Sequence, residues 1–539
     1  MSRRTRKRER IEAKRSVDGI RPLLVSVIVL AAALRLWHVD TPVGGFHAFN
    51  EGNYLLIATN FLTGSLLFPT PDGHYLFLET PPLFPYVLAL TFAVTGVSLL
   101  AARVVSAMIS IGLVLATFLF GKRLVGERAG LFAAAIMAVA PVSLLTGRNV
   151  QTDSLFLLLL VLSLGAYLDA GAASPKRWWW FGALFGLALF TKLFAVVVIP
   201  AILVWEVLAN RAQRRWRDPR LWLALLLAGA LSGAFYGYQA LRSGSYVWRD
   251  VTGGAAPATT MPASGAEWGG LALEAVWAAS PFIALVLVLG VLDAARRRSR
   301  EILFAGLCLL AFGAFYLFLH KHSYYLLAML PFGAVLAGNA AEALASRRRL
   351  WIALLGAVAA TGTFFSLMDL AGMKLGFGEF AEFGRRAAAI PASAHPVLVR
   401  REIRDNYGTV IQFYDPRARL FSVEDLAADP DGRLRVPDSN SPLLLSFVSP
   451  QATEIQGGWL LTRDRYALEV FGWSFAEAHA NPHYFREGEY VVERTGSLID
   501  FGFRWIRTYP AVAVIPLPEQ VAVYRTPDGY AVKPIEARR

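Results

Sequence analysis

Charged residues are scarce in this chain, and cysteine is almost absent. Asp, Glu, Lys and Arg make up 17% of the 539 residues, and hydrophobic residues make up 55%. A soluble domain averages about 25% charged residues. The one cysteine, Cys308, excludes a disulfide within the chain, and its place inside an apolar run is typical of packing. The composition therefore predicts an integral membrane protein.

Lys and Arg are missing from residues 38–102, although the chain as a whole has a net charge of +13. Basic residues gather instead in short clusters between apolar runs, at 3–15, 122–128, 176–177, 211–220, 296–300 and 347–349. Such clusters mark cytoplasmic loops, which excludes nucleic acid as the reason for the positive charge. Residues 38–98 are then predicted to form a loop on the outer face.

If every basic cluster lies in the cytoplasm, the apolar runs predict about 11 transmembrane helices. The expected spans are 22–37, 99–121, 129–147, 152–170, 178–191, 193–209, 221–240, 274–292, 302–319, 323–345 and 350–371. Residues 82–97 are expected to lie on the outer face or to re-enter it, and a polar outer loop is expected at 241–273. The first helix is expected to stay uncleaved, with the N-terminus in the cytoplasm.

The last third of the chain has a different composition. Residues 372–539 are more polar, with short β-rich runs such as HPVLVR and PLLLSFV and a helical patch, EFAEFGRRAAA. Alternating strands and helices predict a small α/β domain, and the odd number of spans places it outside. The chain thus divides into a basic cytoplasmic N-terminus (1–21), a polytopic α-helical transmembrane domain (22–371) and an extracytoplasmic α/β domain (372–539).

The predicted topology brings several polar turns to the outer face. Ionisable groups at membrane depth are costly and usually face a cavity or a partner. A carboxylate in such a cavity can take the proton of an acceptor hydroxyl, and Lys, Arg and Tyr donors suit a phosphate. The candidate side chains are Glu51; Arg148, Asn149, Gln151 and Asp153; Lys192; and His320, Lys321, His322, Tyr324 and Tyr325.

Each charged candidate also has a simpler structural interpretation. Glu51 can stabilise the positive end of a following interfacial helix, and Asp153 can be the N-cap of a helix that begins TDSLFLLLL. Arg148 can pair with a lipid phosphate, and Lys192 can extend along apolar surface toward water. Metal dependence stays open: a divalent ion would have to use His47, His74 and Glu79 of the first outer loop, or His320 and His322.

Several stretches within residues 20–370 together resemble a known family. They are NEGNYLLIATNFLTG, TPPLFPYVLAL, the block from ARVVSAM to TDSLFLLLLVLSL, TKLFAVVVIP and HKHSYYLLAMLPFGAVLAG. These motifs resemble those of the GT-C membrane glycosyltransferases of the protein O-mannosyltransferase and aminoarabinose-transferase type. The resemblance implies the GT-C fold and the transfer of a sugar from a polyprenyl-phosphate carrier to an acceptor at the outer face.

Two departures from the family pattern affect the assignment of roles. The first-loop Asp-Glu of the family reads Asn50-Glu51 here. An amide cannot accept a proton, so Glu51 or Asp153 must supply the catalytic carboxylate. The basic residue that often precedes Pro-Pro is also absent, and Glu79-Thr80 stands there. The resemblance implies substrate-binding roles for Asn50, Tyr54, Arg148, Lys192, His320, Lys321, His322, Tyr324 and Tyr325.

The sequence therefore predicts an inverting glycosyltransferase of the bacterial plasma (inner) membrane. Its expected partners are a polyprenyl-phosphate-linked sugar, an acceptor hydroxyl on a lipid, glycan or protein, and the surrounding membrane lipids. A transporter or flippase of a lipid-linked sugar is the alternative, but it would need polar residues along the inner halves of the spans as well, and these look apolar. A non-enzymatic sensor would not need Glu51, Asp153 and Lys192 on three separate outer turns.

Overall fold

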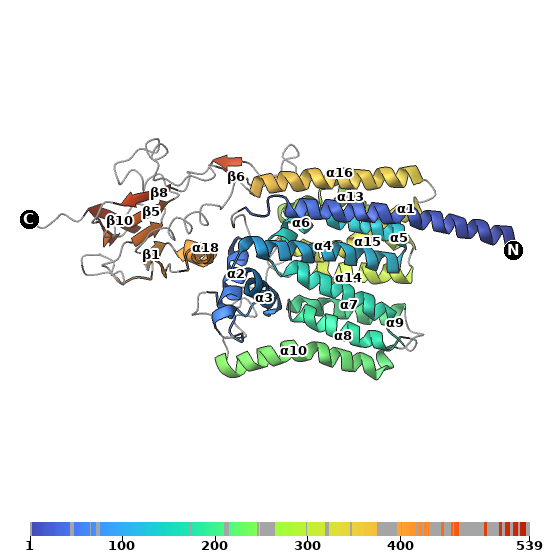
Figure 1. Cartoon of the computed structure of the whole chain (residues 1–539), viewed down its shortest axis with the longest axis horizontal. Helices are drawn as coiled ribbons and strands as arrows, with labels where there is room; N and C mark the ends of the chain where they lie inside the picture. Colours follow the sequence, from blue (N-terminus) through green and yellow to red (C-terminus); the bar gives the residue numbers. More distant parts are fainter. Residues whose placement is uncertain are drawn as a thin grey trace, which may run out of the picture. The chain divides into compact units, whose positions relative to one another are not determined.

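The computed structural model describes most of the chain up to residue 373 and short stretches beyond it (Figure 1). The described residues are 3–41, 43, 48–64, 66–71, 76–171, 174–209, 215–244, 247, 265–297, 299–317, 323–344, 348–373, 396–399, 401–416, 419–422, 425–427, 430, 443–446, 454–455, 458–462, 490–492, 506–508, 513–517, 521–526 and 529–534. The chain forms two compact units. The first comprises Met1–Asp40, Phe61–Pro69 and Leu76–Asp369, and the second comprises Thr41–Asn60, Thr70–Tyr75 and Leu370–Arg539.

The first unit is a helical bundle whose long helices run roughly side by side (Figure 1). Its elements are α1 (Arg3–Leu36), α3 (Leu83–Thr95), α4 (Leu99–Leu124), α5 (Glu127–Val139), α6 (Pro141–Arg148), α7 (Asp153–Asp169), α8 (Lys176–Leu189), η1 (Leu193–Val197), α9 (Val198–Leu208), η2 (Arg215–Arg217), α10 (Pro219–Ser243), α12 (Gly265–Ala279), α13 (Pro281–Arg297), α14 (Arg300–Leu317), η3 (Ser323–Ala328), α15 (Leu330–Ala343) and α16 (Arg348–Met373). Helix α5 lies at the centre, because it contacts α1, α4 and α15 and is buried along most of its length.

Four helices of the described part are long and apolar enough to cross a membrane, namely α4, α10, α14 and Arg348–Met368 of α16. The chain is therefore a membrane protein, while the count of about 11 spans stays a prediction. Residues 129–147, predicted as one span, form α5 and α6 with a bend of 62° between them. Residues 274–292 are likewise broken at Ser280, and α12 already begins within the predicted loop 241–273. Both breaks precede a proline, which lacks the N–H that would bond to the preceding turn.

Helices α8 and α10 pack closely through small residues. A Cβ added to Gly182 would lie 2.7 Å from the carbonyl oxygen of Ala224, and one added to Gly186 would lie 2.9 Å from the Cα of Ala228. Within lipid, helices associate through close backbone packing, which small residues at four-residue spacing permit. Helix α8 leads directly to the turn that carries Lys192.

The second unit includes the first part of the predicted outer loop. Helix α2 (Ala48–Thr63) begins in this unit and packs against α18 (Arg401–Tyr414). A Cβ added to Gly52 would lie 2.6 Å from Thr409 Oγ1 and 3.0 Å from the backbone nitrogen of Val410. The backbone nitrogen of Val43 donates to the Tyr414 hydroxyl at 3.2 Å. Glycine at position 52 therefore allows the two helices to touch.

A mixed sheet forms the described part of the C-terminal region. Its strands are β1 (Pro396–Val399), β2 (Arg419–Ser422), β3 (Leu443–Ser446), β5 (Gly458–Thr462) and β8 (Ala513–Leu517), in the order β2-β1-β3-β5-β8. The β1–β2, β1–β3 and β3–β5 pairs are parallel, and β8 is antiparallel to β5. Helix α18 connects the parallel strands β1 and β2, which is the α/β pattern expected from the sequence. The limits of this domain and its place outside the membrane stay predictions.

Two small antiparallel sheets complete the described strands. Strand β9 (Val521–Thr526) lies between β10 (Gly529–Pro534) and β4 (Glu454–Ile455), and β6 (Tyr490–Val492) pairs with β7 (Ile506–Thr508). The β9–β10 hairpin has a full register from Gly529–Thr526 to Pro534–Val521.

Candidate active site

Asp153 and Lys192 form a buried ion pair in the first unit. Lys192 Nζ donates to Asp153 Oδ1 at 2.7 Å, and the two side chains are only 7% and 10% exposed. Asp153 lies in the first turn of α7, where the helix dipole favours a negative charge. Lys192 lies in the turn between α8 and η1. The fold thus brings together two predicted site residues from separate turns.

Three aromatic rings surround the Lys192 ammonium. Its nitrogen lies 4.9 Å from the ring centroid of Phe194, 5.4 Å from that of Tyr324 and 4.9 Å from that of Tyr325. Cation–π attraction at such distances strengthens when the cation is removed from water. Tyr324 and Tyr325 were predicted from the sequence, whereas Phe194 was missed. The signal for Phe194 was its place two residues after Lys192, in the 3-10 helix η1 that follows the turn.

Two of the simpler interpretations are wrong. The N-cap of α7 is Thr152, and Asp153 is the first residue of the helix, with its carboxylate bonded to Lys192. Lys192 does not extend toward water, because its side chain is buried against Asp153 and the aromatic rings. Taking both charges out of water is costly, and a short, hydrogen-bonded pair offsets that cost.

Arg148 contacts the end of α1. It is the last residue of α6, and its Nη2 donates to the carbonyl oxygens of Trp37 at 2.9 Å and His38 at 2.7 Å. The residue is buried, so a contact within the protein replaces the lipid phosphate of the simpler interpretation. Arg148 lies five residues before Asp153, so the same connection carries both predicted residues.

The bend between α5 and α6 is held by Arg35, which was not predicted as a site residue from the sequence. This fully buried side chain donates to the carbonyl oxygens of Ala138 at 2.9 Å and Met137 at 3.1 Å. It also donates to the hydroxyl oxygens of Ser110 at 2.7 Å and Ser143 at 3.0 Å. The last carbonyls of a helix have no partner within it, and Arg35 supplies one at the break. A lone arginine inside an apolar run was the signal.

Glu51 lies in the second unit, on α2. The side chain is buried in the first turn of that helix, with Tyr54 buried one turn later and Asn50 half-buried. The next residue is Gly52, which touches α18, so the C-terminal segment contributes to the surroundings of Glu51. A first-turn carboxylate fits both interpretations given above, stabilisation of the helix end and a role in catalysis.

The sequence also predicted candidate residues in two outer loops. His47, His74, His320, Lys321 and His322 lie outside the described residues. Glu79 is described and exposed. Within the described ranges, no group of three or more His, Cys, Asp or Glu side chains is placed to hold a metal ion. Metal dependence therefore stays open.

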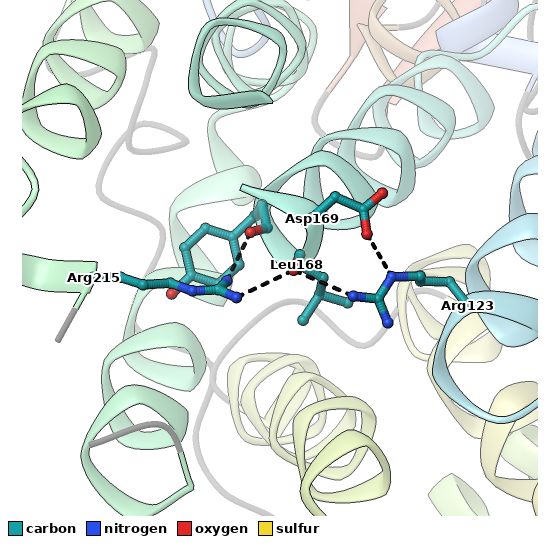
Figure 2. Close-up of polar contacts among 5 residues, drawn as sticks. Arg123, Leu168, Asp169 and Arg215 are labelled. Carbon is teal, nitrogen blue, oxygen red and sulfur yellow. Dashed lines mark hydrogen bonds and ion pairs between the residues drawn. The ribbon is translucent and has the colours of Figure 1, made fainter. Parts of the chain in front are cut away.

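A second polar cluster lies at the other end of α7, about 25 Å from Asp153 for a helix of this length. Arg215 donates to the carbonyl oxygens of Tyr167 at 2.9 Å and Leu168 at 3.2 Å, and the contact with Leu168 is drawn in Figure 2. Arg123 donates to the Leu168 carbonyl at 3.4 Å and to the Asp169 carboxylate at 2.5 Å (Figure 2). These arginines satisfy the carbonyls that a helix C-terminus leaves without partners.

The half of the bundle that was predicted to face the cytoplasm is thus less apolar than expected from the sequence. Buried Glu206 accepts a hydrogen bond from the Tyr167 hydroxyl, and the Arg215 guanidinium lies 5.6 Å from the Tyr167 ring centroid. Because Arg215 is bonded to the end of α7, this cluster joins α7, α9 and η2. We interpret it as a structural brace.

Part of the first unit matches a known family. Residues 79–233 match the family described as "Dolichyl-phosphate-mannose-protein mannosyltransferase". An uncharacterized protein of Aquifex aeolicus (strain VF5) is 25% identical over 218 residues, which are 40% of this chain and 44% of that protein. The mannosyltransferase-like protein YycA of Bacillus subtilis (strain 168) is 24% identical over 213 residues, 39% of this chain and 30% of YycA. The chain spans less than half the length of either relative.

Solved structures share the fold of almost the whole chain. ArnT from Cupriavidus metallidurans matches with a TM-score of 0.60 at 15% identity in the apo state, over 93% of this chain and 98% of ArnT. The undecaprenyl-phosphate-bound form matches with a TM-score of 0.61 at 16% identity, over 92% of this chain and 98% of ArnT. The oligosaccharyltransferase AglB from Archaeoglobus fulgidus, solved with an inhibitory peptide and a dolichol-phosphate, matches with a TM-score of 0.56 at 14% identity, over 75% of this chain and 64% of AglB.

The chain therefore has the GT-C fold of ArnT-like membrane glycosyltransferases. The resemblance predicted from the sequence motifs is confirmed at the level of the fold, and by the family match over residues 79–233.

Proposed function

We propose that this chain is an inverting glycosyltransferase that moves a sugar from a polyprenyl-phosphate carrier to an acceptor hydroxyl at the outer face of the membrane. The observation that carries the proposal is the buried Asp153–Lys192 pair with its aromatic surround, set in a GT-C fold. A structure with the same fold holds undecaprenyl phosphate, which supports a carrier of that chemical class.

In this proposal, Lys192 stabilises the negative charge of the departing phosphate. Transfer breaks the bond between the anomeric carbon and the phosphate oxygen, and the electron pair leaves with the polyprenyl phosphate. A phosphate leaving group needs charge stabilisation more than protonation. Lys192 supplies a positive charge that Asp153 and three rings hold in one place. Arg148, Lys321 and a tyrosine of the Tyr324–Tyr325 pair complete the phosphate site in this proposal.

Glu51 is the better candidate for the base. An Asp153 oxygen already accepts a hydrogen bond from the Lys192 ammonium, and a proton arriving there would break the ion pair. Glu51 instead orients the acceptor hydroxyl and takes its proton as the oxygen attacks the anomeric carbon. Attack from the face opposite the phosphate inverts the configuration. Asn50 and Tyr54, near Glu51 on α2, assist in placing the acceptor.

Glu51→Gln tests the base directly. Membranes that contain the protein are incubated with radiolabelled polyprenyl-phosphate sugars, and transfer and lipid retention are measured separately. Loss of a general base costs roughly 10²–10⁴-fold in rate, so turnover should collapse while lipid retention persists. Asp40→Asn is the matched control, because Asp40 is an exposed carboxylate just after α1. Turnover of Glu51→Gln at the level of Asp40→Asn would remove Glu51 from the mechanism.

Sidedness is a separate part of the proposal. We place the protein in a bacterial plasma membrane, with the N-terminus in the cytoplasm and the site and C-terminal domain outside. Exposed positions 40 and 122 provide the test, as Asp40→Cys and Lys122→Cys in a Cys308→Ala background. An impermeant thiol reagent added outside intact cells should label position 40 and spare position 122. Labelling of both positions from one side would contradict the topology.

A transporter or flippase of the same lipid is the second candidate. The buried cluster of Tyr167, Glu206 and Arg215 at the inner end is the observation that favours it, because a permeation path needs polar groups at both ends. Against it, Arg215 is bonded to the helix end. Purified protein in vesicles separates the two candidates: a flippase moves labelled lipid across the bilayer without acceptor, whereas the proposed enzyme forms a glycosylated product.

A further inference from the structure

Two buried polar side chains beside the ion pair have no hydrogen-bond partner among the described residues. Gln151 lies two residues before Asp153 and is 2% exposed, and neither its amide nitrogen nor its amide oxygen is bonded. Ser154 follows Asp153 directly, is equally buried, and its hydroxyl is also unbonded. Buried polar groups in native proteins are almost always paired, so each exception needs an explanation.

The surroundings of these residues point to a ligand. The α6–α7 connection lies where η3, which carries Tyr324 and Tyr325, contacts both α6 and α7, and where α12 contacts α6. All residues from Asn149 to Ser154 are buried there. A buried amide without a partner costs stability, and proteins tolerate that cost at functional sites. Here the unpaired groups flank the carboxylate of the proposed phosphate site on both sides.

We propose that Gln151 and Ser154 form a subsite for the neutral hydroxyl groups of the transferred sugar. A carboxamide offers two N–H donors and one carbonyl acceptor, and a serine hydroxyl both donates and accepts. This set matches neighbouring hydroxyls of a pyranose ring. It carries no charge, in contrast to Lys192, which is assigned to the phosphate. The subsite rests on the proposed function. It would bind the sugar of the donor, whereas Lys192 binds the phosphate.

The chemistry predicts an unusual combination of effects for Gln151→Met, which keeps the length of the side chain. Replacing an unpaired buried amide by an apolar group of similar shape removes no protein hydrogen bond, so the ligand-free protein should be as stable as before or more stable. Affinity for the sugar-bearing lipid should fall roughly 5- to 30-fold, as expected for two lost neutral hydrogen bonds. Affinity for the bare carrier, undecaprenyl phosphate, should not change.

The experiment measures the binding of two probes, undecaprenyl-phosphate mannose and undecaprenyl phosphate, to the detergent-solubilised full chain. The variants are Gln151→Met and Ser154→Ala. The control is Gln239→Met, because Gln239 is also a buried glutamine whose amide nitrogen donates to the Leu67 carbonyl at 2.6 Å, so that only its amide oxygen lacks a partner among the described residues. Thermal unfolding of each ligand-free protein is recorded in parallel. The subsite is supported if Gln151→Met loses affinity for the mannose lipid while Gln239→Met keeps it. The unfolding temperature of ligand-free Gln151→Met must also not fall.

The other outcomes overturn it in distinguishable ways. If the wild type binds both lipids and Gln151→Met discriminates between them as the wild type does, the subsite is wrong and the proposed function stands. If Gln151→Met lowers the unfolding temperature of the ligand-free protein, the amide is satisfied within the protein, and the subsite is again wrong. If the wild type retains neither lipid, the proposed function fails, and the subsite fails with it.

Discussion

Lys192 and Asp153 are 39 residues apart in the sequence, yet their side chains meet at 2.7 Å inside the helical bundle. One comes from the turn after α8 and the other from the start of α7. The fold thus brings together two predicted site residues, a cation proposed to bind phosphate and a carboxylate.

Removing one partner of this pair should destabilise the protein more than removing both. Lys192→Met or Asp153→Asn leaves a buried charge without its partner, at a cost of about 3–5 kcal/mol. The double change Asp153→Leu with Lys192→Met removes both charges and should recover most of that loss. Chemical unfolding of the detergent-solubilised protein measures the difference. A loss in the double variant equal to the sum of the two single losses would mean that the charges do not interact in the protein.

Enlarging Gly52 should loosen the contact between α2 and α18. An alanine Cβ would lie 2.6 Å from Thr409 Oγ1 and 3.0 Å from a backbone atom, so one helix must move, at about 1–3 kcal/mol. Hydrogen–deuterium exchange of residues 401–414 should accelerate in Gly52→Ala. Gly165→Ala is the matched control, because a Cβ there meets open space and should stabilise α7 by up to about 1 kcal/mol. Unchanged exchange in Gly52→Ala would contradict the contact.

Arg35 should be essential for the bend between α5 and α6. Arg35→Met removes the donor of the Ala138 carbonyl and of two serine hydroxyl oxygens, and leaves the Met137 carbonyl with Ser143 alone, which should cost at least about 3 kcal/mol. Arg35→Lys should recover only part, because an ammonium cannot reproduce the planar fork of donors. Thermal unfolding checks both changes against Arg21→Met, an exposed arginine of the same helix. A loss no larger than that of the control would show that the bend holds without Arg35.

The two arginines at the C-terminal end of α7 should differ in their contribution to stability. Arg215 is buried and bonded to two helix carbonyls, so Arg215→Met should cost about 2–3 kcal/mol. The Arg123 side chain is 46% exposed, and its pair with Asp169 should be worth no more than about 1 kcal/mol. Unfolding midpoints in denaturant measure the two variants side by side. The reverse order would mean that the exposed pair, and not Arg215, braces the helix end.

Much of the arrangement followed from local features of the chain. Apolar runs and basic clusters predicted most helices of the first unit to within a few residues, because both signals are read within one helix and its flanks. The breaks at Pro141 and Pro281 were missed, since a proline inside an apolar run does not reveal how far the helix turns. The short strands around α18 were expected from β-rich runs, but their order β2-β1-β3-β5-β8 depends on distant pairings.

The sequence by itself determined that this is a membrane protein, and its motifs predicted the GT-C fold and the polar turns that carry most candidate residues. Only the tertiary structure decided that Asp153 bonds to Lys192, that Arg35 holds the broken helix, and that Gly52 lies against α18. Local propensities act over about four residues along a helix. These contacts join residues separated by tens to hundreds of positions, so the packing of whole helices sets them.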